Sequence, residues 1–342
     1  MDFAIGIGRN ESMHEIGDHA RVAEESGFKY LTIVDIPYLG REVDAMMTMA
    51  ALNTSKIRIG QGVTDPFTRH PLVTANATAS IDELSGGRAF VGIGTGGPWG
   101  KPMAKPTKLA DLKKAVTFIK RFSAGEEVEW DGVKFRSEWC RKELKVYIAC
   151  GGPKACQLAG EVADGVIATS NADLTTNQWR MEQIAKGAER AGRDPGEIDY
   201  WVRGMIYVAD SKEQARREVA GYAVNGAYLL WLQMQQKTPE SEDLRKRLEK
   251  AQPGMLEDCQ QVCEAFDPKW VEHPDAPAAK FITQRIIDSQ HVVGTPDDCC
   301  EQLKRLEEAG MKTFGTVTYT IDEKRDMMKE IAEKVMPHFV SR

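Results

Sequence analysis

A short stretch between two predicted elements has the residues needed to bind an anion through the backbone. It consists of Ala149, Cys150, Gly151, Gly152, Pro153 and Lys154. An apolar run precedes it and a predicted helix follows at once, so free N–H groups and the positive end of the helix dipole would face an incoming anion. Pro153 is compatible with a first helical turn, and Lys154 adds positive charge. We predict a phosphate site here; a tight strand-to-helix turn without a ligand is the alternative.

The region from Lys56 to Trp99 supplies a second group of candidate binding residues. Two β-like runs, 57–64 and 88–94, flank a run with helical periodicity at 72–84. A strand–helix–strand order requires a parallel crossover, so both strands end at the same edge of the sheet. The residues at these ends suit backbone contact with a ligand, and we predict such contacts from Gln61, Gly62, Val63, Thr64, Gly94, Thr95 and Gly96.

The glycines between Gly92 and Gly97 suggest a dinucleotide-binding turn, but their context does not match it. That pattern requires the third glycine to lead straight into a helix. Here Pro98 and Trp99 follow, and the next helix is predicted only from about residue 107. We interpret the glycines as positions without side chains, where a flat ring can lie against the backbone. A plain strand-end turn is the alternative.

The composition argues against several classes of function. The chain has 342 residues and a formal charge of −6, from 45 basic and 51 acidic residues, which gives no reason to expect nucleic acid or an anionic membrane as a partner. It contains no long apolar run and its first residues are not basic, so we expect neither secretion nor a membrane span. The seven cysteines have no histidine at ligand spacing. We interpret them as reduced thiols of a cytoplasmic protein without a metal site.

Strand-like and helix-like segments alternate along the whole chain. Eight predicted strands, each followed by a helix, indicate an α/β fold, a (β/α)₈ barrel that forms one domain over residues 1–342. The seventh strand is predicted over 200–209 and the eighth over 312–320. Sites in such barrels lie at the C-terminal ends of the strands. The residues that would gather there include Asp35, Thr64, Thr95, Cys150 and Ser170.

Two insertions are expected in this barrel. A small hairpin near 126–140 is predicted because Asp131-Gly132 separates two short β-like runs. A largely helical segment near 229–290 contains charged helices and scattered prolines. Its mixed charge suits a solvated surface, a lid near the site or a subunit contact.

Three motifs together resemble a known family. They are the runs 62–71 (Gly-Val-Thr-Asp-Pro-Phe-Thr-Arg-His-Pro), 82–88 (Asp-Glu-Leu-Ser-Gly-Gly-Arg) and 92–96 (Gly-Ile-Gly-Thr-Gly). They resemble the bacterial-luciferase-like flavin and deazaflavin oxidoreductases, most of all the branch of methylenetetrahydromethanopterin reductase, which uses coenzyme F420. The resemblance covers about half of the chain, from about residue 5 to 170, with weaker agreement near 293–310. It implies a luciferase-like barrel, F420 as cofactor and a small-molecule substrate, and we also expect a homo-oligomer, a dimer.

The resemblance also implies roles for individual residues. The Gly151-Gly152 pair matches the one that holds the coenzyme phosphate. A non-proline cis peptide bond is expected around residues 61–63, where it would bulge against the deazaflavin ring. Asp35 matches an aspartate that many relatives place near the coenzyme, and it is one of two candidate catalytic residues.

Other candidates lie around these motifs. Arg69 and His70 are candidate acid/base groups, and His70 is the second candidate catalytic residue. Its place just before a helix makes a structural role the alternative. Trp99 and Phe67 are candidates for the walls of the substrate pocket, with a role in the core as the alternative.

Coenzyme F420 carries a lactyl phosphodiester and an oligoglutamate tail, so its site should include basic residues that lead outward from the phosphate turn. Lys154 lies at that turn, and Arg180 and Lys186 lie on the helix after the sixth strand. Simple solvation of these side chains is the alternative.

Two features of the sugar-phosphate dehydrogenases in the family are missing. Ile36 stands where they have a catalytic histidine, and Gly97 stands where they have an acidic residue. We therefore expect a hydride exchange between reduced F420 and a different small organic substrate. The alternatives are a monooxygenase that uses reduced flavin mononucleotide (FMN) and a non-catalytic flavin-binding relative.

Overall fold

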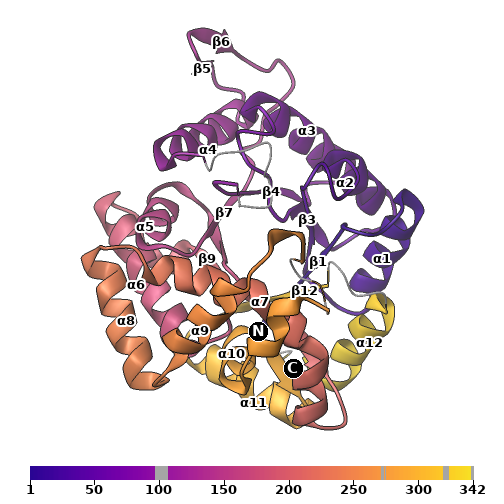
Figure 1. The fold of residues 1–342 in the computed structure, drawn as a ribbon. Coiled ribbons are helices and arrows are strands. Elements are labelled where there is room, and N and C mark those ends of the chain that lie inside the picture. Colours follow the sequence, from indigo (N-terminus) through magenta and orange to yellow (C-terminus); the bar gives the residue numbers. More distant parts are fainter. Residues whose placement is uncertain (97–106, 271–272, 274, 319–322, 340–342) are drawn as a thin grey trace.

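Eight parallel strands form a closed barrel in the order β1-β12-β9-β8-β7-β4-β3-β2. The computed structural model describes residues 1–96, 107–270, 273, 275–318 and 323–339. Figure 1 shows the strands at the centre and the helices arranged around them. The predicted (β/α)₈ barrel is confirmed.

The barrel strands are short and most of their residues are buried. They are β1 (Asp2–Ile7), β2 (Tyr30–Ile33), β3 (Arg58–Gln61), β4 (Ala89–Ile93), β7 (Val146–Cys150), β8 (Gly165–Ala168), β9 (Asp199–Gly204) and β12 (Thr313–Val317). The helices that surround them are α1 (Met13–Glu25), α2 (Val43–Leu52), α3 (Pro71–Leu84), α4 (Leu109–Ser123), α5 (Pro153–Val162), α6 (Leu174–Arg190), α7 (Lys212–Met234) and α12 (Lys324–Lys334).

Local signals in the sequence set where several helices begin. At α1 the Ser12 side chain accepts from the Glu15 N–H and Glu15 accepts in return, which is the predicted capping box. Pro71 is the first residue of α3, where its missing N–H costs nothing.

The register of the sheet brings the predicted ligand-contacting residues to one edge. Ile33 pairs with Gln61, so the ends of β2 and β3 are level. Thr64 forms an isolated parallel bridge with Ile93 at the end of β4, and Cys150 pairs with Ala168 at the ends of β7 and β8. The carboxyl ends of five neighbouring strands therefore form one continuous rim, which we call the mouth.

The opposite end of the barrel is closed by aromatic side chains around one carboxylate. Asp199 Oδ2 accepts from the Trp201 indole N–H at 2.7 Å, from the Tyr147 hydroxyl at 3.0 Å and from the Tyr30 hydroxyl at 3.5 Å. Its Oδ1 accepts from the Thr313 hydroxyl at 3.4 Å. These residues lie at or near the first residues of their strands, and we call this group the floor.

The prediction of one continuous seventh strand over 200–209 is wrong. It is divided at Met205 into β9, which belongs to the barrel, and β10 (Ile206–Val208), which pairs outside it with β11 (Val292–Gly294). The Met205 N–H donates to His291 Nδ1 at 3.2 Å, and the Ile206 N–H donates to the Thr316 hydroxyl at 3.0 Å. These side chains replace the strand partners that a longer β9 would need. The eighth strand also ends earlier than predicted, at Val317, and residues 319 and 320 lie outside the described part.

The hairpin is present as β5 (Val128–Trp130) and β6 (Val133–Phe135), and it projects beyond α3 and α4 (Figure 1). Asp131 and Gly132 between them both have positive φ, 51° and 81°. This is the geometry of the two-residue turn predicted from Asp-Gly.

Among the described residues, four α-helices lie between α7 and β12. They are α8 (Pro239–Ala251), α9 (Met255–Glu264), α10 (Gln284–Gln290) and α11 (Pro296–Glu308). The predicted start of the helical segment, residue 229, falls inside α7, and α10 and β11 were not predicted. All seven cysteines are free, and six are buried; Cys263 on α9 is partly exposed. No helix in the described part of the chain is long and apolar enough to cross a membrane.

Candidate active site

Three predicted ligand-contacting residues from different strands meet at Gly94. A Cβ added there would lie 3.3 Å from Cγ2 of Val63 and 3.4 Å from the Cβ of Ala149. The β3, β4 and β7 ends are thus in direct contact across a position that has no side chain. Thr95 and Gly96 continue from it, while Gly97 and Trp99 lie outside the described residues.

The expected non-proline cis peptide bond is present at Gly62–Val63. The Gly62 N–H donates to the Ile33 carbonyl at 2.7 Å, and the Thr64 N–H donates to the Gly92 carbonyl at 2.9 Å. A Cβ on Gly62 would come within 2.5 Å of the Thr32 Cβ. Only glycine therefore fits at position 62 beside β2.

Only the backbone of Gln61 lies at the mouth. Its fully buried side chain points into the helix layer, where the amide N–H donates to the Thr78 hydroxyl on α3 at 3.0 Å. The same group lies 3.4 Å from Asp44 Oδ1 on α2. The amide oxygen of Gln61 and the hydroxyl of buried Thr64 have no hydrogen-bond partner among the described residues.

The predicted phosphate turn has the geometry of an open helix N-terminus. Gly152 is the N-cap of α5, Pro153 is its first residue, and no side chain caps the helix. A Cβ on Gly151 would lie 2.5 Å from the Thr169 hydroxyl, whereas a Cβ on Gly152 would meet only the Gln236 amide, at 3.7 Å. Glycine is therefore required at 151 for space, while position 152 can carry a side chain.

The other residues of this turn differ in exposure. Lys154 is exposed, and Ser170 is partly exposed next to Thr169 at the end of β8. Cys150 is buried, and the neighbouring Cys156 thiol together with burial raises its pKa, so it is a neutral thiol. The Thr169 N–H donates to the Cys150 carbonyl at 3.0 Å, which ties the two strand ends together.

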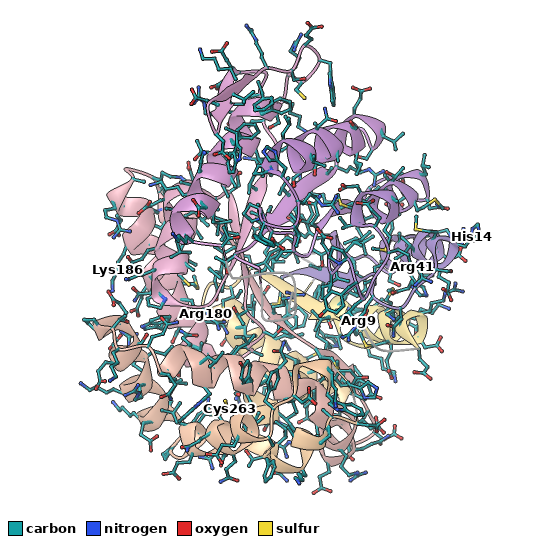
Figure 2. The ribbon with its side chains drawn as sticks, turned by 45° about the horizontal axis from the view of Figure 1, so that its top comes forward. Arg9, His14, Arg41, Arg180, Lys186 and Cys263 are labelled. Carbon is teal, nitrogen blue, oxygen red and sulfur yellow. The ribbon has the colours of Figure 1, made fainter. Side chains whose placement is uncertain are left out.

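Arg180 was predicted to be one of the basic residues that lead outward from this turn, but it is buried behind the turn. Its side chain is 2% exposed, and Nη1 donates to the Thr169 carbonyl at 2.9 Å. Nη2 would be 3.7 Å from a Cβ on Gly151. Nε has no partner among the described residues. Figure 2 shows Arg180 nearer the centre of the molecule and Lys186, which is exposed, at its outer edge.

A cluster of carboxylates around Arg69 borders the mouth on the side of β2. Arg69 Nη2 lies 2.9 Å from Glu42, Nη1 lies 3.0 Å from Asp44, and Nε lies 3.3 Å from Asp35. Burial raises the pKa of Asp44 to about 6, against the opposing effect of Arg69. Asp35 is therefore present as a buried ion-paired residue at the end of β2, as its predicted position requires.

His70 occupies the N-cap of α3. Its Nδ1 accepts from the Leu72 N–H at 3.1 Å, and its ring packs edge-on against Trp130 of the hairpin, with centroids 5.4 Å apart. These contacts are those of a structural residue, and the catalytic role of His70 stays a prediction. Phe67 is 57% exposed, so it does not belong to the core. In the described part of the chain, no group of three or more His, Cys, Asp or Glu side chains is placed to hold a metal ion.

Comparisons with known proteins identify the family of this chain. The sequence profile of the family described as luciferase-like monooxygenase matches residues 2–313. A 5,10-methylenetetrahydromethanopterin reductase of Methanolobus tindarius is 30% identical over 329 residues, covering 91% of this chain and 92% of that protein. An F420-dependent hydroxymycolic acid dehydrogenase of Mycobacterium tuberculosis is 33% identical over 222 residues, covering 58% of this chain and 60% of that protein.

A solved structure has the same fold. The coenzyme F420 dependent tetrahydromethanopterin reductase from Methanopyrus kandleri superposes with a TM-score of 0.77 at 23% identity, over 99% of both chains. The family profile spans most of the barrel, and the resemblance predicted from three motifs is confirmed. The chain therefore belongs to the luciferase-like monooxygenase family and is an enzyme of that family.

Proposed function

We propose that this enzyme exchanges a hydride between reduced coenzyme F420 and a small organic substrate. One observation carries the proposal: strand ends that glycine allows to lie close together and an open helix N-terminus are neighbours at the same mouth. Gly62 and Gly94, just past β3 and β4, form the first, and the Gly151-Gly152 turn after β7 forms the second. Barrel order places these strands side by side.

This arrangement fits the two chemical parts of the cofactor. A planar deazaflavin ring needs a flat backbone surface, and a phosphodiester needs free N–H groups. The ring supplies the hydride when it is bound. The chain would hold the phosphate at the Cys150–Pro153 turn and the ring against Val63 and Gly94, and would exclude water from the space between ring and substrate.

The relatives support F420 over FMN. The Mycobacterium tuberculosis relative is named as F420-dependent, and the Methanolobus tindarius relative is a methylenetetrahydromethanopterin reductase. We propose that Asp35 lies within reach of the cofactor or the substrate. Because it forms an ion pair with Arg69 at 3.3 Å, it would act as a fixed anion that accepts hydrogen bonds.

The test is an anaerobic titration of the purified protein with oxidised and reduced forms of F420 and FMN. We expect saturable binding of F420, negligible binding of FMN, and oxidation of reduced F420 by a member of a broad panel of electrophiles. Tight FMN binding with oxygen consumption would instead favour the monooxygenase. Binding of either cofactor without turnover across the panel would favour the non-catalytic relative.

We also propose a cytoplasmic homodimer as the working form of this enzyme. Light scattering of the purified protein across a range of concentrations tests the dimer. A mass of one chain at all concentrations would reject it.

A further inference from the structure

Arg180 is a buried cation that has no anionic partner in the protein. It is 2% exposed, yet among the described residues no carboxylate forms an ion pair with it. Its guanidinium donates to two neutral groups, the Thr169 carbonyl and the Tyr200 hydroxyl. Its Nε has no partner. An arginine cannot be deprotonated in a protein, so the positive charge stays in place. A buried unpaired charge is costly, and such a group calls for a compensating anion.

The side chains around Arg180 are neutral. Burial raises the pKa of the Tyr200 hydroxyl, and the pKa of the Cys150 thiol is raised by Cys156 and by burial. The Tyr200 hydroxyl donates a hydrogen bond to Asn177 Oδ1 at 2.7 Å. None of these groups supplies negative charge at neutral pH.

The guanidinium is placed directly behind the turn that we assign to phosphate. Nη2 would lie 3.7 Å from a Cβ at Gly151, and the absence of that Cβ leaves the charge close to the backbone of the turn. The N-terminus of α5 opens on the same turn and has no side-chain cap. Two independent sources of positive potential, a helix N-terminus and a buried arginine, thus converge on one place.

We propose that Arg180 provides the counter-charge for a tetrahedral phosphate group bound at the Cys150–Pro153 turn. This inference rests on the proposed function and assigns Arg180 as the residue that makes the site prefer a phosphate-bearing deazaflavin over a phosphate-free one. Exposed Lys154 and Lys186 are screened by salt, but a buried charge is screened much less. The preference for phosphate should therefore persist at high salt.

The experiment compares two ligands that share the deazaflavin ring and ribityl chain, F420 and its analogue without the phosphodiester. Dissociation constants are measured by fluorescence titration for the wild type, Arg180→Met and Arg180→Lys. The control is Arg190→Met at the other end of the same helix, where the arginine pairs with Glu161 at 2.8 Å. We expect Arg180→Met to weaken F420 binding by about ten-fold or more and to leave the analogue within about two-fold. Arg190→Met should change neither.

A second measurement separates a role in binding from a role in folding. Removal of a buried uncompensated charge should leave the thermal unfolding temperature of the ligand-free protein unchanged or raised. Added inorganic phosphate should raise that temperature in the wild type but not in Arg180→Met. If Arg180→Met does not fold, Arg180→Lys keeps the charge and should keep the preference for F420 over the analogue.

The inference is overturned if Arg180→Met loses affinity equally for both ligands or for neither. It is also overturned if Arg180→Lys loses the preference for F420 over the analogue. Failure of the proposed function looks different, because the wild type itself would then not bind F420. A wild type that binds F420 and an Arg180→Met variant that binds it equally well would reject only the role of Arg180.

Discussion

The two ends of the barrel treat buried polar groups in opposite ways. At the floor, one carboxylate accepts hydrogen bonds from Trp201, Tyr147 and Tyr30, and each of these donors has a partner inside the protein. At the mouth, the Thr64 hydroxyl and Arg180 Nε have none among the described residues. Native interiors pair nearly all such groups, so unpaired ones need an explanation.

The comparison separates the residues that stabilise the barrel from those that we expect to contact a ligand. A floor whose donors are all satisfied stabilises the barrel whether or not a ligand is bound. A mouth with unsatisfied groups gains partners only from a ligand. Changes at the floor should therefore alter unfolding and spare binding, while changes at the mouth should do the reverse.

The largest expected effect is a loss of stability caused by a substitution in the floor. Asp199→Ala would leave the donors of Tyr30, Tyr147 and Trp201 without their acceptor, and we expect a loss of about 4 kcal/mol in the free energy of unfolding. Urea denaturation measures it. Asp199→Asn, which keeps one acceptor oxygen, is the control and should lose less. An alanine variant as stable as the wild type would remove the contrast between the two ends.

The next effect is a pH-dependent loss of stability that comes from Asp44 on α2, in the helix layer beside the mouth. Because burial raises the pKa of Asp44 from 3.8 to about 6, the folded state holds this proton more tightly than the unfolded state. The folded protein therefore loses stability as the pH rises from about 4 to about 6, by at most about 3 kcal/mol, and the contribution is constant above that window. The facing charged groups are Arg69, Asp35 and Glu42.

Asp44→Asn tests this by removing the titration. The difference in free energy of unfolding between the variant and the wild type should shift in favour of the variant from pH 4 to pH 6.5 and then level off. Paired urea titrations at several pH values give this difference. A difference that does not change with pH would show that Asp44 does not hold a proton in that range.

A smaller effect is expected in binding alone. Gly152 has φ −79° and ψ 160°, which any residue adopts, and its Cβ position is free of close contacts. Aspartate is a good N-cap, so Gly152→Asp should not destabilise α5, but its carboxylate would occupy the anion site. We expect cofactor binding to weaken about ten-fold, or about 1.4 kcal/mol, by titration. Gly152→Ala is the matched control, and unchanged affinity in the aspartate variant would place the phosphate elsewhere.

The smallest expected effect is a loss of stability in the β5–β6 hairpin, which is part of neither the floor nor the mouth. Gly132 has φ 81° and no atoms near its Cβ position, so Gly132→Ala would cost only the strain of a left-handed turn, about 1 kcal/mol. Val133→Ala, next to it and 55% exposed, is the control without that strain. Thermal unfolding measures the loss. A change in cofactor affinity in the Gly132 variant would show that the hairpin is coupled to the mouth.

Patterns that act over a few residues were predictable from the sequence. The capping box at Ser12 and Glu15, the turn at Asp131-Gly132 and the helix start at Pro71 each depend on neighbours in the chain. Regular alternation of strands and helices then left few topologies other than the barrel. The resemblance added the cis peptide bond at Gly62–Val63, which no local propensity indicates.

Features that depend on distant residues were not predictable. The break at Met205 needs His291 and Thr316, which lie 86 and 110 residues away from their partners. The burial of Arg180 depends on how α6 packs against the end of β8, and helical periodicity alone did not fix which face would be covered. The cluster around Arg69 likewise joins α2 to the loop before α3.

Cys263 makes this enzyme suitable for site-specific labelling without an engineered cysteine. The other six thiols are buried, so a maleimide dye should react at this one position on α9, labelled in Figure 2. Burial raises the pKa of Cys263, so the reaction is best run at mildly alkaline pH. Tyr228 on α7 stacks on Phe266, just past α9, with ring centroids 3.8 Å apart. A dye on Cys263 would therefore report, by fluorescence anisotropy, on the contact between α9 and α7, and Gln236 just past α7 lies 3.7 Å from a Cβ at Gly152.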